Sequence, residues 1–124
     1  MENNVSTNKL LNCSAVFYEF LGTVFLALNL SAAGVWARNN SGDLHLDAIV
    51  AFFTIWYLVI LTGRVSFAQF NSALTLVWLC RSEKGHFTRL RYGLPILFAE
   101  MLGGFFGALL VWWVKGEVAY PAIP

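Results

Sequence analysis

The fold is decided by residues 63–76, which read Gly-Arg-Val-Ser-Phe-Ala-Gln-Phe-Asn-Ser-Ala-Leu-Thr-Leu. Strongly apolar runs lie on either side, yet the middle of this stretch is polar, and the apolar run from Ala73 to Leu79 is too short to cross a bilayer. This pattern is typical of a re-entrant segment, a loop that enters the membrane and continues as a half-helix with Asn71 at its N-terminus. Non-helical backbone at membrane depth persists only where protein covers it or a water-filled cavity lines it. The stretch therefore predicts a channel-type fold rather than a set of membrane anchors.

The composition is that of a membrane protein. Of the 124 residues, 58% are hydrophobic and 12% are charged, and the mean hydropathy is +0.64. A soluble domain carries about 25% charged residues. The net charge is +1, and the basic residues form no run with aromatic stacking partners, which argues against a nucleic-acid partner. Cys13 and Cys80 lie far apart without metal-ligand or redox spacing, so we expect two buried free thiols.

Three segments are long enough to span a bilayer at a rise of about 1.5 Å per residue. They cover residues 14–36, 47–62 and 90–114, and a half-helix is predicted over 72–80. The fold class is therefore an all-α membrane protein with three transmembrane helices and a re-entrant half-helix. A polar N-terminal tail (1–13), which does not resemble a cleavable signal, and a C-terminal tail (115–124) flank this domain.

The distribution of lysine and arginine predicts the orientation. Lys9 precedes the first span, and Arg38 and Lys115 lie at the opposite face. Between the half-helix and the last span lies a basic cluster of Arg81, Lys84, Arg89 and Arg91. The positive-inside rule places the N-terminus and this cluster in the cytoplasm or an equivalent compartment, in a membrane that the sequence does not name.

Three motifs together resemble the aquaporins, the major intrinsic proteins. Residues 19–23, Glu-Phe-Leu-Gly-Thr, resemble the Glu-x-x-Gly-Thr of their first helix, and residues 63–76 resemble their first pore loop, Gly-His-Ile-Ser-Gly-Ala-His-Leu-Asn-Pro-Ala-Val-Thr. Ala99-Glu100, followed by Gly103-Gly104 and Gly107-Ala108, resembles the Ala-Gln and two Gly-Ala pairs of their third helix. The resemblance covers residues 14–114, one three-helix half of that family.

An aquaporin contains two inverted halves whose half-helices meet at the midplane. The resemblance therefore implies a half-channel that passes water or small neutral solutes when a partner completes it, with the lipid bilayer and other membrane subunits as its partners. The alternative is a non-conducting structural subunit of a larger membrane complex, or a truncated aquaporin isoform. No nucleophile-base arrangement, metal cluster or phosphate loop is visible, so we expect neither enzyme activity nor a cofactor.

The resemblance implies a pore-loop site at Phe67, Gln69, Asn71, Ser72 and Ala73. Ser72 stands where the family has proline, Gln69 where it has histidine, and Phe67 where it has glycine; Arg64 likewise replaces a histidine. A proline at the first helical position is preorganised, so serine loosens the start of the half-helix, and Phe67 adds bulk that could occupy the pore. Two interpretations of Asn71 stay open, a side-chain donor to a passing solute or an ordinary helix N-cap.

Two carboxyl groups and four glycines complete the candidate residues. The resemblance implies that Glu19 accepts backbone N–H groups of the pore loop. Glu100 lies near mid-membrane depth, where a carboxyl group must be protonated or paired, with Arg64 or another subunit as candidate partner. Close helix packing is predicted at the small residues Gly22, Gly103, Gly104 and Gly107.

Overall fold

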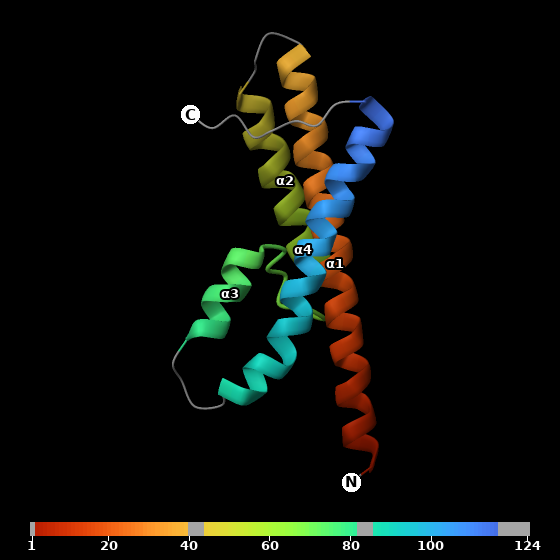
Figure 1. The fold of residues 1–124 in the computed structure, drawn as a ribbon, viewed down its shortest axis with the longest axis vertical. Coiled ribbons are helices and arrows are strands. Elements are labelled where there is room, and N and C mark those ends of the chain that lie inside the picture. The colour runs from red at the N-terminus through yellow and green to blue at the C-terminus, as the bar shows by residue number, and fades with distance from the viewer. Residues whose placement is uncertain (1, 40–43, 82–85, 117–124) are drawn as a thin grey trace.

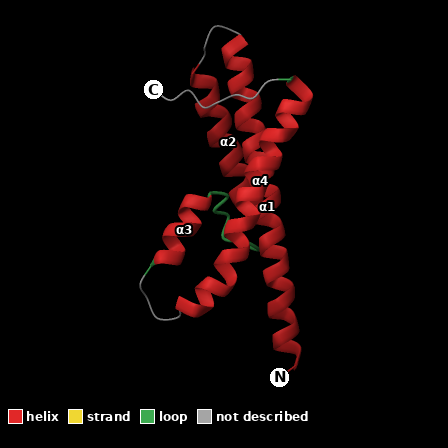
Figure 2. Ribbon diagram, in the orientation of Figure 1, coloured by secondary structure: helices red, strands yellow, loops and turns green. Residues whose placement is uncertain are grey.

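The computed structural model describes residues 2–39, 44–81 and 86–116, with backbone alone for 2–12, 44 and 86–89. These residues form four helices, α1 (Glu2–Asn39), α2 (Leu44–Thr62), α3 (Ser72–Cys80) and α4 (His86–Lys115). Figure 2 shows that the described elements are all helical. The helix predicted over 72–80 is present as α3.

Two helices begin well before their predicted apolar segments. α1 starts at Glu2 rather than at residue 14, because residues 2–12 contain no glycine or proline that would end a helix. α4 starts at His86 rather than at residue 90. α2 begins at Leu44, so that Asp47, predicted to cap it, lies inside its first turn near the positive end of the helix dipole. The predicted C-terminal tail lies outside the described residues beyond Gly116.

Three of the helices are long and apolar enough to cross a membrane. Their apolar spans are Cys13–Asn39, His45–Thr62 and Leu90–Lys115, with 27, 18 and 26 residues. At about 1.5 Å per residue these spans measure about 40, 27 and 39 Å, against about 30 Å for the hydrocarbon core. α3 has nine residues and is too short to span.

α1 and α4 run side by side in the same direction through the centre of the molecule (Figure 1). α2 returns along the upper part of α1, whereas α3 packs on α4 in the lower half. α3 begins near mid-height and descends toward the end at which α4 begins (Figure 1). We call this lower end, where both α1 and α4 begin, the N-terminal end.

Glycines allow the backbones of α1 and α4 to touch. A Cβ on Gly103 would lie 2.7 Å from the Phe20 carbonyl oxygen, and one on Gly107 would lie 2.6 Å from the Val24 carbonyl oxygen. A Cβ on Gly22 would collide with the ring of Phe70. Gly104, by contrast, faces open space within 4 Å, so the close packing predicted there is not made inside the described chain.

The lower part of α4 bends away from α1 toward α3 (Figure 1). α4 contains one internal proline, Pro95. Proline has no N–H to donate to the carbonyl group of Arg91, and its ring clashes with that group, which kinks a helix. The bend separates the N-terminal ends of α1 and α4.

Candidate functional site: the loop between α2 and α3

The loop begins with a tight turn at the end of α2. The N–H groups of Val65 and Ser66 both donate to the Thr62 carbonyl oxygen, at 2.8 and 2.9 Å. The Ser66 side chain then accepts the Ala68 N–H at 3.1 Å. Thr62 and Ser66, at the two ends of the turn, are buried, whereas residues 63–65 between them are exposed.

Glu19 of α1 holds the next part of the loop. Its Oε1 accepts the N–H of Gln69 at 3.2 Å, and its Oε2 accepts the N–H of Phe70 at 2.9 Å. The Glu19 side chain is completely buried. Both carboxyl oxygens therefore satisfy backbone donors that have no helical partner, which is the role that the resemblance implied for this residue.

Two residues of this loop adopt left-handed backbone conformations. The φ angles of Ala68 and Phe70 are 49° and 45°. Residues other than glycine adopt such angles at a cost and hold them when their surroundings fix them. Alternation of left- and right-handed residues turns successive N–H groups toward one anion, and here that anion is Glu19. Phe67 stands where the resembled family has glycine, whereas the positive φ angles of this loop fall at Ala68 and Phe70.

Glu100 of α4 holds the junction between the loop and α3. Its Oε1 accepts the N–H of Asn71 at 3.3 Å and lies 2.9 Å from the hydroxyl oxygen of Thr75. Its Oε2 is buried and has no partner among the described residues. The predicted partner Arg64 is wrong, because Glu100 finds its donors in the loop and in α3, and no described ion pair joins it to the exposed Arg64.

Thr75 links the two parts of this network. Its hydroxyl group lies between Glu100 Oε1 and the side-chain oxygen of Gln69, and its one proton goes to one of these oxygens at a time. If the side-chain amide of Gln69 were rotated by 180°, its N–H group would donate to the Thr75 hydroxyl oxygen. The Thr75 hydroxyl group would then donate its proton to Glu100 Oε1. The Thr75 side chain is fully buried. Thr75 was not predicted as a site residue, although it is the one polar side chain within the apolar run 73–79.

Asn71 caps α3. Its backbone is extended, and its side-chain oxygen accepts the N–H of Ala73 at 3.0 Å. This geometry establishes the N-cap interpretation. The residue is exposed, and its side-chain nitrogen has no acceptor among the described residues. Ser72 is half-buried as the first residue of α3, and Ala73 is exposed.

The ring of Phe67 packs against Trp78 of α3, with ring centroids 5.3 Å apart. Both rings line an apolar cleft between α1 and α4, and Asn71 is not part of that lining. The bulk predicted to occupy a pore therefore lies in this cleft, away from the start of α3. The ring of Phe70, which the sequence analysis overlooked, is buried against Gly22.

The two cysteines differ from the prediction. Cys13 and Cys80 are free thiols as expected, but both are exposed rather than buried. Each lies at the N-terminal end of the molecule, one at the start of the α1 span and one at the end of α3. Within the described residues, no three His, Cys, Asp or Glu side chains lie together as a metal site would require.

The fold defines an integral multi-pass membrane protein, because its three long helices are apolar and expose most of their large hydrophobic side chains. Comparison of the chain with protein families, curated proteins and solved structures finds no match.

Proposed function

We propose that this chain is one half of an aquaporin-like membrane channel, which passes water or small neutral solutes when a partner supplies the other half. The loop 63–71 and α3 act as a re-entrant segment. The proposal rests on the position of Asn71. This residue caps α3, is exposed, and keeps a side-chain N–H group available to a solute.

The depth of the loop fits this role. Glu19 lies six residues beyond the start of the α1 span at Cys13, and Glu100 lies ten residues beyond the start of the α4 span at Leu90. At about 1.5 Å per residue the two carboxyl groups lie about 9 and 15 Å into the membrane, and half of the hydrocarbon core is about 15 Å. Asn71, bonded to Glu100, therefore lies near the midplane.

The electrostatics favour neutral solutes. The N-terminus of α3 carries the positive end of the helix dipole, which repels cations. The two carboxyl groups that would attract cations, Glu19 and Glu100, are 0% and 1% exposed and bind the loop from behind. A solute at Asn71 would thus meet hydrogen-bond donors rather than negative charge.

The partner completes the pore. In the family that the sequence resembles, two half-helices meet from opposite faces, and α3 would act as one of them. The partner would be another membrane subunit with the opposite orientation. The lysine and arginine distribution places the N-terminal end of this chain on the cytoplasmic or equivalent side.

A second candidate function is that of a non-conducting structural subunit of a larger membrane complex, or of a truncated aquaporin isoform that joins full-length ones. It is favoured by α2, which buries a single stripe of Thr54, Leu58 and Thr62. The remainder of this helix exposes large side chains that neighbouring subunits could cover, among them Phe52, Phe53, Trp56, Tyr57 and Ile60.

Water access to position 71 tests the half-channel. A single cysteine is introduced as Asn71→Cys in a Cys13→Ser, Cys80→Ser background, and a small charged thiol reagent is added to membranes that contain the partner. We expect modification of this cysteine, because a thiol in an aqueous pore ionises. The matched control is Val77→Cys on the same helix, whose side chain is exposed toward the apolar surroundings and should stay unmodified. Equal protection of both positions would contradict a water-lined loop.

A further inference from the structure

The cleft between α1 and α4 is a feature that the proposed function does not use. It has a volume of about 830 Å³, within the range of about 300–1,000 Å³ typical of small-molecule sites. α1 contributes Cys13, Phe17 and Phe20 to its walls, and α4 contributes residues from Arg91 to Leu102. Pro95, which lies inside α4, is part of the lining.

The cleft has the depth of one membrane leaflet. Its outer end is marked by Cys13 and Arg91, which lie where the α1 and α4 spans begin. Its inner end is marked by Leu102, about 16 Å further along α4 at about 1.5 Å per residue. One leaflet of the hydrocarbon core is about 15 Å thick. A single acyl chain that enters at the interface would therefore follow the cleft to its end.

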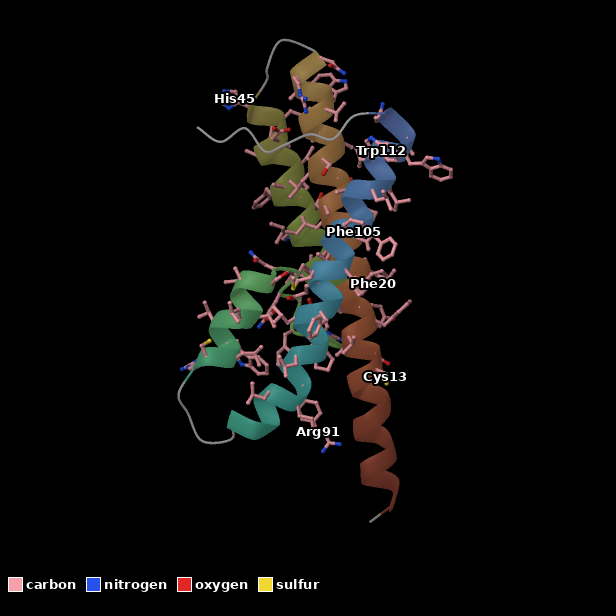
Figure 3. All side chains as sticks on the ribbon, in the orientation of Figure 1. Cys13, Phe20, His45, Arg91, Phe105 and Trp112 are labelled. Carbon is pink, nitrogen blue, oxygen red and sulfur yellow. The ribbon has the colours of Figure 1, made fainter. Side chains whose placement is uncertain are left out.

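The charge in the cleft lies at one end. Among the described residues of the lining Arg91 is the one that is charged, and the walls beyond it are apolar and aromatic, including the Phe67–Trp78 pair. Arg91 is exposed and forms no ion pair with a described carboxyl group. Tyr92, beside it in the lining, adds a hydroxyl group. In Figure 3 Arg91 lies at the lower end of α4, toward α1.

We propose that this cleft binds one anionic phospholipid, with its phosphate at Arg91 and one acyl chain along the cleft toward Leu102. The charge complementarity at the interface selects the headgroup, and the apolar walls bind the chain. The lipid site is independent of conduction and of the partner.

Lipid retention tests the headgroup contact. The full chain is reconstituted in phosphatidylcholine vesicles that contain one fifth phosphatidylglycerol, extracted in mild detergent, and analysed for bound lipid by native mass spectrometry. We expect one retained phosphatidylglycerol per chain, and a loss of about fivefold in Arg91→Gln, which is the effect of one cation near an anionic surface. The matched control Lys115→Gln removes a cation at the opposite end of the same helix and should retain the lipid. Equal retention by wild type and Arg91→Gln, or equal loss in both variants, would overturn the site.

Protection of Cys13 tests the acyl chain. In a Cys80→Ser protein, the rate of Cys13 alkylation should fall when phosphatidylglycerol is added to phosphatidylcholine vesicles, and Ala15→Phe, which fills the cleft, should remove the lipid dependence. A Cys13→Ser protein reports on Cys80, which lies outside the lining and should show no dependence on the lipid. Inorganic phosphate should give no protection. Protection by phosphate alone, or a photo-crosslink from Cys13 to a protein rather than to a lipid, would contradict the proposal.

Discussion

Phe70 is fixed to α1 through both its backbone and its side chain. Its N–H donates to Glu19 Oε2 at 2.9 Å, and its ring fills the space left by Gly22 one turn further along the same helix. Glu19 and Gly22 belong to a single motif, Glu-x-x-Gly-Thr. This motif therefore contacts Phe70 twice, once through a hydrogen bond to its N–H and once through packing against its ring. This double attachment explains how a residue with a φ of 45° is held in place.

Exchange of the two buried glutamates for glutamine should have unequal effects. Glu19 uses both carboxyl oxygens, so Glu19→Gln leaves one loop N–H without an acceptor, and we expect a loss of about 1–3 kcal/mol in the free energy of unfolding. Glu100 uses Oε1 alone, so Glu100→Gln keeps its acceptor and should change stability by less than about 1 kcal/mol. Unfolding in detergent, followed by circular dichroism, compares the two variants. Equal losses would show that both carboxyl groups act through their charge.

Glu19→Ala should disrupt assembly rather than conduction alone. This variant removes both acceptors and leaves the N–H groups of Gln69 and Phe70 unpaired in a covered site. We expect recovery of the detergent-solubilised protein and of its complex to fall, measured by size-exclusion chromatography. Normal assembly with an unchanged thermal transition would argue against the structural role.

Thr75 should matter for its hydroxyl group rather than for its shape. Thr75→Val keeps the side-chain volume but removes the group between Gln69 and Glu100, which should cost about 1–3 kcal/mol of stability. Thr75→Ser keeps the hydroxyl and serves as the control. If valine is tolerated better than serine, packing and not hydrogen bonding determines this position.

Three glycines of α4 allow a matched comparison of packed and open positions. Gly103→Ala and Gly107→Ala each place a Cβ against the α1 backbone, and overpacking of this kind costs about 1–3 kcal/mol. Gly104→Ala meets open space and should be neutral or more stable, by up to about 1 kcal/mol. Urea or dodecyl sulfate titration of the purified protein measures the three values. A loss at Gly104 equal to that at Gly103 would indicate a contact with another chain.

The topology can be tested by labelling. Single cysteines at Asn4 and Ser82 should react from one side of the membrane and a cysteine at Asn39 from the other, as the lysine and arginine asymmetry predicts. An impermeant maleimide added to sealed vesicles makes the assignment. Reaction of all three positions from one side would contradict three spans.

The sequence predicted the apolar spans and α3 well because hydrophobic run length and a polar interruption are local signals. Ser72–Cys80 was predicted to the residue, and the close approaches at Gly103 and Gly107 were found from their spacing. The N-terminal extension of α1 was not predicted, because residues 2–12 are mostly polar and hydrophobic run length gives no signal for a polar helix.

The contacts of the loop were harder to predict, because they depend on which side chains a three-dimensional path brings together. Arg64 or a residue of another subunit was predicted as the partner of Glu100, whereas its donors in the described chain are a backbone N–H and a hydroxyl group. Phe67 was selected from the sequence because of its size, whereas the ring of Phe70 packs against Gly22 of α1. A bend in α4 could have been predicted from the sequence, since Pro95 lies inside a helical run and proline bends a helix.

Osmotic water permeability tests the half-channel most directly. Vesicles that contain this chain alone should shrink at the rate of empty lipid, and vesicles that contain the chain with its co-purified partner should shrink faster, with Asn71→Ala reducing the gain. Val77→Ala, at an exposed position of the same helix outside the pore-loop site, serves as the control variant. Fast shrinkage by the chain alone that disappears in Asn71→Ala would contradict the need for a partner. Shrinkage at the empty-lipid rate even with the partner would contradict conduction and leave the structural subunit as the function of this protein.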